Sequence, residues 1–332
     1  MSENLRFGLL GSGSWATAIA KMLLTNVDTL NWWVRREETK EHLEQHGRNP
    51  NYIQSISFDT SKLAVSTSMQ EVIDQSDVLI FAIPSAHLDD AIQDQKVSGV
   101  DKKLLISAIK GMVVKYDSIP ARYLHKEFQV PYNRIGLIAG PCHAEEVARE
   151  KLSYLTVACP DLEIAQTVAN SLKTRYIRVS TSEDVFGTEI AAVLKNIYAI
   201  AAGIALGLGY GDNFLSVLIS NASQEMKAFL AAVHELDRDV KKSPYLGDLL
   251  VTAYSPHSRN RNLGMMIGKG YSVKGAIMEM SMVAEGYNGA EGIFEMNKRF
   301  KAQLPIADAV YRILHERMSP VIEMRLLIEE LS

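Results

Sequence analysis

The sequence is poor in cysteine and shows no excess of charge of one sign. Only two of its 332 residues are cysteines, Cys142 and Cys159, and their spacing matches neither a CxxC motif nor a zinc site. The 35 Lys and Arg residues are scattered along the chain, and 39 Asp and Glu residues leave a net charge of −4. We therefore expect a reduced, cytoplasmic protein without a bound metal and without a nucleic-acid partner.

Long apolar runs are also missing. The longest weakly polar segment extends from Ile197 to Gly211 and contains four glycines, whereas a membrane-spanning helix needs about 20 consecutive apolar residues. We predict that this segment is a buried helix that continues into a glycine-rich loop. The amino-terminal sequence MSENLRFGLL has no basic leader followed by an apolar core and a cleavage site, so neither a targeting signal nor a membrane partner is expected.

The apolar and charged residues that are present follow two patterns, one in each half. Up to about residue 185, short apolar runs alternate with amphipathic stretches, which is typical of a doubly wound parallel sheet with helices on both faces. The candidate strands are Leu5–Leu10, Thr29–Val34, Val78–Ile83, Leu104–Ala108, Arg134–Ala139, Tyr154–Ala158 and Tyr176–Val179. From Phe186 onward the patterns are helical. We predict a Rossmann-type α/β domain over residues 1–185 and an all-helical substrate and catalytic domain over residues 186–332.

The first expected strand ends in a glycine-rich turn. Gly11, Gly13 and Ala16 form a GxGxxA pattern between this strand and an Ala-rich helix. Gly11 permits the tight turn, Gly13 allows a pyrophosphate to approach the backbone, and Ala16 lets the helix pack closely on the strand. The pattern predicts a dinucleotide site, and the alternative interpretation is a purely structural turn.

The residues after the second strand bear on the choice of cofactor. An NAD site usually has an acidic residue about 20 positions beyond the glycines, and an arginine there accepts the 2′-phosphate of NADP. Arg35 and Arg36 occupy this place, with Glu37 and Glu38 directly behind them. The pattern favours NADP over NAD, while a solvated charge run at the start of a helix is the alternative.

Two lysines lie in unusual surroundings. Lys110 follows a strand, between Ile109 and Gly111, and ligands of such sheets bind outside the carboxyl ends of the strands. Lys195 lies on an apolar helix, where loss of solvent would lower its pKa toward a value useful for proton transfer. The alternative for Lys110 is an ordinary surface lysine. The alternative for Lys195 is a lysine whose apolar stem is buried while its ammonium group reaches solvent.

The segment around residue 258 predicts a phosphate site. Ser258 is expected to cap a helix whose first residue is Arg259. A cation at a helix amino terminus is unfavourable unless an anion joins it, so Arg259 is expected to bind a phosphate in bidentate fashion. The alternative is a cap without a ligand.

Taken together, these segments resemble the bacterial NAD(P)-dependent glycerol-3-phosphate dehydrogenases. The matching motifs are, in order, GSGSWATAIA, FAIPS, SAIKG, GPCHAEEVA, EIAAVLKNIYAIAAGIALGLGYGDN, GDLLVT, SPHSRNRNLG and VAEGYNG. The resemblance implies hydride transfer between glycerol 3-phosphate and a nicotinamide cofactor, with dihydroxyacetone phosphate as the product. It also implies a cytoplasmic enzyme that supplies glycerol 3-phosphate for phospholipid synthesis.

The same resemblance implies roles for individual residues. Lys195 would accept the proton, with Asp248 and Lys110 beside it. The substrate would contact Lys110, Gly140, Cys142, Lys195, Asp248, Ser258, Arg259 and Asn260. NADP or NAD, already expected at Gly11 and Gly13, would also contact Ser14, Trp15, Arg35, Arg36, Lys110, Ala144, Arg259, Val283 and Glu285.

The chain departs from the family pattern at several positions. The family usually has Ser or Thr in place of Cys142 and Phe in place of His143, so the contact at Cys142 is made by its side chain or by its backbone. Two other functions are the alternatives: a 3-hydroxyacid or ketopantoate type of dehydrogenase, which would need a carboxylate clamp, and a non-catalytic NAD(P)H sensor, which would not need Lys195 and Asp248. A homodimer is the commonest assembly of soluble oligomers and is the expected one here.

Overall fold

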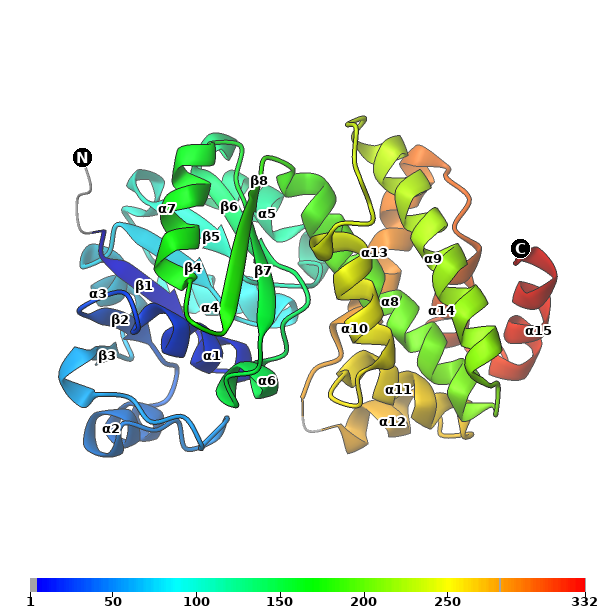
Figure 1. The fold of residues 1–332 in the computed structure, drawn as a ribbon, viewed down its shortest axis with the longest axis horizontal. Coiled ribbons are helices and arrows are strands. Elements are labelled where there is room, and N and C mark those ends of the chain that lie inside the picture. The colour runs from blue at the N-terminus through cyan, green and yellow to red at the C-terminus, as the bar shows by residue number, and fades with distance from the viewer. Residues whose placement is uncertain (1–4, 281, 332) are drawn as a thin grey trace. The chain divides into compact units, whose positions relative to one another are not determined.

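The computed structural model describes residues 5–280 and 282–331 and comprises two units (Figure 1). Unit 1 consists of Met1–Ile109 and Pro120–Val185, and unit 2 consists of Lys110–Ile119 and Phe186–Ser332. The chain therefore passes from one unit to the other three times. The sequence pattern did not indicate that residues 110–119 group with the helical half. The expectation that the amino-terminal sequence carries no targeting signal falls partly on residues 1–4, which lie outside the described residues.

Unit 1 is an α/β unit built on a sheet of eight strands. The strands have the order β3-β2-β1-β4-β5-β6-β7-β8. They are β1 (Phe7–Leu10), β2 (Leu30–Trp33), β3 (Leu63–Ser66), β4 (Val78–Phe81), β5 (Leu104–Ser107), β6 (Ile135–Ala139), β7 (Ser153–Ala158) and β8 (Ile177–Ser182). The central strands are buried and continuously apolar, as expected for strands that are covered on both faces.

Helices cover both faces of this sheet (Figure 1). They are α1 (Ser14–Leu23), α2 (Glu37–His46), α3 (Met69–Asp74), α4 (Leu88–Gln95), α5 (Pro120–Phe128), α6 (Ala144–Ala148) and α7 (Leu162–Leu172). Helices α1 and α7 pack together on one face, and α4 and α5 lie on the opposite face. The predicted Rossmann-type architecture is confirmed.

Two details of the sheet differ from the prediction. Strand β7 runs antiparallel to β6, because the connection between them contains only the five-residue helix α6, which is too short to carry the chain back along the sheet. Strand β3, with the sequence LAVS, was not among the predicted strands. It is an edge strand with only one buried residue, so it lacks the continuous apolar run of its neighbours.

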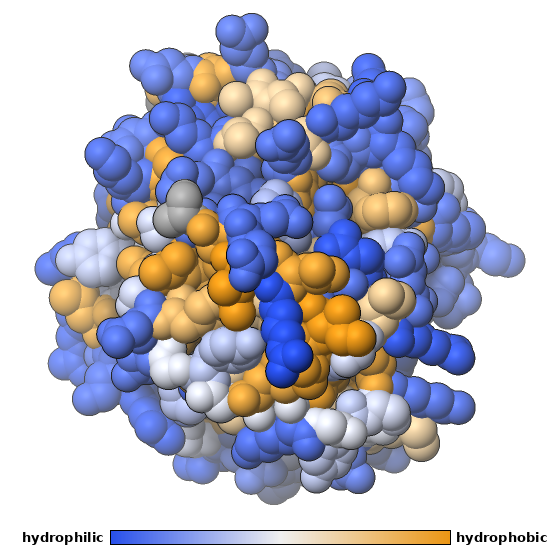
Figure 2. All heavy atoms as spheres, turned by 90° about the vertical axis from the view of Figure 1, so that its right-hand side faces the viewer, coloured by the Kyte–Doolittle hydropathy of each residue, from blue (hydrophilic) through white to orange (hydrophobic). Residues whose placement is uncertain are grey.

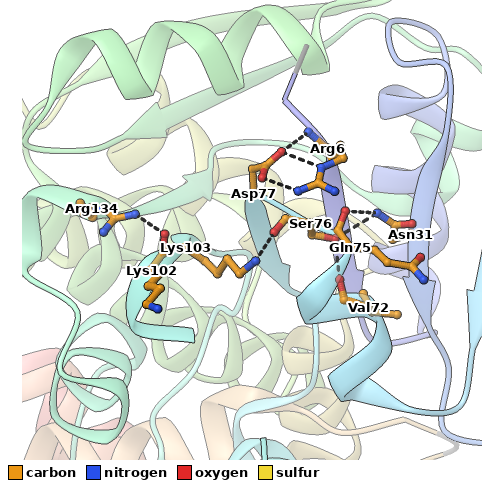
Figure 3. Close-up of polar contacts among 9 residues, drawn as sticks. All are labelled: Arg6, Asn31, Val72, Gln75, Ser76, Asp77, Lys102, Lys103 and Arg134. Carbon is orange, nitrogen blue, oxygen red and sulfur yellow. Dashed lines mark hydrogen bonds and ion pairs between the residues drawn. The ribbon is translucent and has the colours of Figure 1, made fainter. Parts of the chain in front are cut away.

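A polar network lies at the amino-terminal ends of the central strands (Figure 3). The Arg6 guanidinium donates to both carboxylate oxygens of Asp77, over 2.8 and 3.0 Å, and holds the pKa of Asp77 at about 2. Asn31 Nδ2 donates to the Gln75 carbonyl and to Ser76 Oγ, both at 3.1 Å. These groups satisfy one another and stabilise the sheet, and the glycine-rich turn lies at the other end of β1.

Unit 2 is helical outside residues 110–119. Its helices are α8 (Val185–Gly207), α9 (Asp212–Val233), α10 (Asp248–Tyr254), α11 (Arg259–Gly268), α12 (Val273–Glu279), α13 (Glu285–Phe300), α14 (Pro305–Leu314) and α15 (Pro320–Glu330). Among the described residues, α8 alone is long and apolar enough to cross a membrane, yet 89% of its apolar window is buried inside the structure. The predicted buried helix is therefore confirmed, and it forms the centre of the unit 2 core.

Glycines bring α8 and α11 into backbone contact. A Cβ atom at Gly203 would collide with the Arg261 carbonyl, and one at Gly264 would collide with the Ile200 carbonyl. Because no side chain separates the two helices there, their backbones touch and their relative register is fixed. This crossing holds the helix that carries Lys195 against the helix that begins with Arg259.

Candidate active site

The glycine-rich turn of unit 1 leaves its backbone open to a ligand. Gly11 has φ = +123°, and a Cβ atom there would lie 2.5 Å from the Ala82 carbonyl oxygen, so only glycine fits. Apart from Gly13 and its two chain neighbours, no described residue has a heavy atom within 4 Å of the position of a Cβ at Gly13. This cradle precedes the first N–H groups of α1, and it fits the pyrophosphate of a dinucleotide.

Two side chains that the sequence analysis did not single out hold this turn in place. Trp32 Nε1 donates to the Gly11 carbonyl over 2.7 Å, from the middle of β2. Asn49 is fully buried, and its Nδ2 donates to the Ser12 carbonyl and to Thr17 Oγ1, both at 2.9 Å. The only sequence signal for these contacts is the occurrence of polar atoms within otherwise buried segments.

The end of β2 presents two free cations. Arg35 and Arg36 are exposed, and neither guanidinium has a hydrogen bond or an ion pair with a described residue. The neighbouring Glu37 carboxylate is engaged, because it accepts from Lys40 Nζ at 2.8 Å and from Thr67 Oγ1 at 3.0 Å. The arrangement is suited to binding an anion such as a 2′-phosphate.

The remaining candidates of unit 1 lie around the end of β6. Gly140 follows this strand with φ = +109°, Cys142 is buried, and Ala144 is the first residue of α6. This turn therefore leads directly into a helix. Helix α6 has only five residues, so it forms little more than one helical turn.

Unit 2 brings three predicted residues together around one carboxylate. Lys195 Nζ on α8 donates to Asp248 Oδ1 over 2.7 Å, and Lys110 Nζ donates to Asp248 Oδ2 over 3.1 Å. The side chains of Asp248 and Lys195 are 1% and 5% exposed, whereas that of Lys110 is 18% exposed. Asp248 was indicated by the family resemblance alone, since it lies 53 residues from Lys195 in sequence.

These buried charges shift one another's pKa. Burial is the largest influence on Lys195, and the positive charges of Lys110 and Arg259 add to it, so its pKa falls to about 8 although Asp248 opposes the shift. Burial acts to raise the pKa of Asp248, but the two ammonium groups outweigh it and the pKa is lowered. The result is an ionised carboxylate beside a lysine that can lose its proton near neutral pH.

Two further side chains complete this cluster, and the sequence analysis assigned neither to the site. Thr252 Oγ1 accepts from Lys195 Nζ over 2.8 Å and donates to the Asp248 carbonyl over 2.5 Å, one turn earlier on α10. Asn196 Nδ2 donates to the Lys110 carbonyl over 2.7 Å. The i, i+4 spacing of Asp248 and Thr252 within GDLLVT is the signal that could have identified the threonine.

The predicted cap of α11 is confirmed. Ser258 Oγ accepts from the Arg261 N–H over 3.2 Å, and Arg259 is the first residue of the helix. The Arg259 guanidinium is exposed and has no hydrogen bond or ion pair with any described residue, which leaves its donors available to an anion. Asn260 Oδ1 accepts from the Gly286 N–H over 2.9 Å, which ties α11 to the start of α13, next to Glu285 and close to Val283.

Comparison with known proteins identifies this arrangement. Two family models match, described as NAD-dependent glycerol-3-phosphate dehydrogenase N-terminus over residues 6–165 and C-terminus over residues 184–324. The NAD(P)+ glycerol-3-phosphate dehydrogenase of Chlorobium limicola is 32% identical over 313 residues, which cover 94% of each chain. That of Limosilactobacillus reuteri is 33% identical over 316 residues, 94% of this chain and 93% of its own.

A solved structure gives the same result. The crystal structure of glycerol-3-phosphate dehydrogenase from Coxiella burnetii is 25% identical, has a TM-score of 0.89, and covers 98% of this chain and 99% of its own. The chain therefore belongs to the NAD-dependent glycerol-3-phosphate dehydrogenase family and is an NAD(P)-dependent enzyme that interconverts glycerol 3-phosphate and dihydroxyacetone phosphate.

Proposed function

We propose that Lys195 is the proton acceptor of this reaction. The oxidation of glycerol 3-phosphate removes a hydride from C2, which a bound nicotinamide cofactor would accept, and a proton from the C2 hydroxyl, so that the C2–O bond becomes a carbonyl. The hydroxyl proton needs an acceptor, and Lys195 Nζ takes it when neutral. A pKa of about 8 leaves roughly a tenth of the lysine neutral at pH 7. In the reverse direction the same ammonium group returns the proton to the carbonyl oxygen.

Asp248 and Lys110 assist Lys195 in this proposal. The Asp248 carboxylate accepts one hydrogen bond from each lysine and so holds both ammonium groups on one side of the site. Its lowered pKa keeps it ionised, so it orients its neighbours and does not compete for the proton. Lys110 is the more exposed lysine, and it would donate to the substrate oxygen and stabilise the charge that develops there.

We infer that the substrate phosphate binds at the start of α11. Ser258, Arg259 and Asn260 offer a capped helix terminus, a free guanidinium and an amide. Because Asn260 Oδ1 already accepts the Gly286 N–H, its Nδ2 remains as a donor for a phosphate oxygen. Gly140 and Cys142 are proposed substrate contacts on the resemblance alone.

The proposed cofactor site follows the turn after β1. Gly11, Gly13, Ser14 and Trp15 would hold the pyrophosphate, and the cofactor supplies a hydride acceptor or donor when it is bound. Arg35 and Arg36 would pair with a 2′-phosphate, which makes NADPH the favoured form. Ala144, Val283 and Glu285 are further contacts that the family resemblance implies.

The observation that carries the assignment of Lys195 is a single carboxylate that bridges two lysines on a buried helical framework. The test replaces Lys195 by alanine. Turnover should fall by about 10²–10⁴-fold, while the affinity for NADPH, measured by its fluorescence, should stay close to that of the wild type. Near-normal turnover in Lys195→Ala would show that another group accepts the proton.

We also propose a cytoplasmic location and a supply of glycerol 3-phosphate to phospholipid synthesis, since this product is the phosphorylated backbone of those lipids. Extracts of cells depleted of the enzyme should then show a fall in glycerol 3-phosphate and in newly made phospholipid. Unchanged levels of both would contradict this role.

A homodimer is the proposed assembly. Figure 2 shows the face of unit 2 that carries α15, where apolar side chains gather, and Val321, Ile322 and Leu326 are 44%, 54% and 54% exposed. Two α15 helices related by a two-fold axis would bury these side chains. Sedimentation should give a dimer for the wild type and a monomer for Ile322→Asp, and a wild-type monomer at micromolar concentration would exclude this assembly.

A further inference from the structure

Residues 110–119 form a segment that connects two parts of unit 1 but belongs to unit 2. The segment starts with Lys110, one of the two lysines on Asp248. Beyond it the chain closes on itself, because the Val113 N–H donates to the Ser118 carbonyl over 2.8 Å and the pair forms an isolated antiparallel bridge. The position of Lys110 therefore depends on how this segment is attached to the helices of unit 2.

Two of the attachments are polar and lie at Lys110 itself. Its ammonium group donates to Asp248 Oδ2, and its carbonyl accepts from Asn196 Nδ2. Such hydrogen bonds contribute modestly on their own, because each exchanges for a bond to water. The segment needs an apolar attachment as well.

Met112 provides that attachment. It is fully buried and belongs to the hydrophobic core of unit 2, two residues beyond Lys110. It lies against α13 at Gly292, where a Cβ atom would be 2.9 Å from Met112 Cγ and 3.0 Å from Met112 Cε. The absence of a side chain at Gly292 therefore makes room for the methionine.

Helix α13 also contacts the helix that carries Lys195. A Cβ atom at Gly286 would lie 2.7 Å from the Asn196 carbonyl oxygen, and one at Gly289 would lie 3.0 Å from Val193 Cγ1. Gly286, Gly289 and Gly292 recur at intervals of three residues, so α13 presents a row of glycines to α8 and to Met112 in turn. One helix thus sets the position of both lysines.

We propose that Met112, seated against Gly292, is a positioning residue that holds Lys110 at Asp248. The proposal rests on the proposed role of Lys195 as the proton acceptor. If Met112 no longer packs against Gly292, Lys110 moves away from the Asp248 carboxylate, and Asp248 then interacts with Lys195 alone. A positive neighbour that disfavours the charged form of Lys195 is removed, so Lys195 should release its proton at a higher pH.

The test measures kcat for glycerol 3-phosphate oxidation between pH 6 and 10 in Met112→Ala, Met112→Leu and Gly292→Ala. We expect Met112→Ala to move the midpoint of the alkaline rise upward by about half a pH unit, which lowers kcat about threefold at pH 7.5. Met112→Leu keeps most of the apolar volume and should restore both values. Gly292→Ala pushes the methionine from the other side and should shift the midpoint in the same direction.

Met324→Ala is the matched control, because Met324 is also a buried methionine of the unit 2 core but lies on α15. It should lower the thermal midpoint as Met112→Ala does and leave the pH profile unchanged. A wild-type profile in both Met112→Ala and Gly292→Ala would overturn the proposal, and so would an equal shift in Met324→Ala. If Met112→Ala does not fold, Gly292→Ala alone decides.

This outcome is distinct from a failure of the proposed role of Lys195. If Lys195→Ala keeps its turnover and its pH dependence, the proton acceptor is misassigned, and any result at Met112 has no bearing on it. If Lys195→Ala is inactive and both Met112→Ala and Gly292→Ala have the wild-type profile, only the positioning role of Met112 is wrong.

Discussion

Lys195 donates a hydrogen bond of 2.7 Å to Asp248, and the two side chains are 5% and 1% exposed to solvent. A buried pair of this kind is costly to assemble, because both ions lose their hydration. Here the second lysine and the Thr252 hydroxyl complete the hydrogen bonding. The arrangement keeps the carboxylate charged and brings the pKa of the Lys195 ammonium to about 8.

The cofactor preference can be tested at the end of β2. Replacing Arg35 and Arg36 by alanine removes two exposed guanidinium groups that are suited to a 2′-phosphate, so the KM for NADPH should rise at least tenfold. The KM for NADH should change little, because NADH has no phosphate there. Steady-state rates with dihydroxyacetone phosphate and each cofactor provide the comparison. Equal changes for both cofactors would mean that the arginines form a solvated charge run.

The phosphate site can be tested at Arg259. Arg259→Ala removes a charge-assisted bidentate donor, and kcat/KM for dihydroxyacetone phosphate should fall by the equivalent of about 3 kcal/mol. Dihydroxyacetone, which lacks the phosphate, should react slowly with the wild type and equally slowly with the variant. A variant that loses the same factor toward both compounds would contradict a phosphate contact at this residue.

A buried acid in unit 2 should make stability depend on pH. Glu225 on α9 accepts the N–H groups of Ile306 and Ala307 at the start of α14, over 2.8 and 3.0 Å, and burial nevertheless raises its pKa to about 8. The folded state therefore binds this proton more tightly than the unfolded state. The resulting stabilisation is complete below about pH 4.5 and is lost as the pH rises to about 8.

Glu225→Gln replaces the acid by a neutral amide that does not titrate. The thermal midpoint of the wild type, relative to that of the variant, should fall steadily between pH 5.5 and 8 and then level off. Calorimetry of both proteins at matched pH values measures this difference. Parallel curves over the whole range would show that Glu225 has no raised pKa.

Much of the fold was predictable because the sequence has strong local patterns. The apolar strands of unit 1 and the long apolar helix α8 stand out against their polar neighbours, and both were predicted. Strand β3 was missed because it has no strong apolar pattern of its own. The reversal at β7 depends on the length of α6, which the sequence does not show clearly.

The site was predictable only where a residue conflicts with its own surroundings. Lys195 on an apolar helix and Arg259 at a helix start are such conflicts, and both were found from the residues themselves. Thr252 and Met112 have ordinary surroundings in sequence. Thr252 is important because it contacts Lys195, 57 residues away along the chain, and Met112 because it contacts Gly292, 180 residues away. No local pattern reports such contacts.

The pH dependence of kcat tests the central claim. According to this claim, Lys195 accepts the proton, and Asp248 opposes the lowering of the pKa of Lys195. For glycerol 3-phosphate oxidation at saturating substrate, kcat should rise with pH to a plateau with a midpoint near 8. In Asp248→Asn the positive charges of Lys110 and Arg259 remain while the opposing carboxylate is lost, so the midpoint should move to lower pH. A midpoint that stays in place in Asp248→Asn, or a wild-type profile that is flat from pH 6 to 10, would contradict the account.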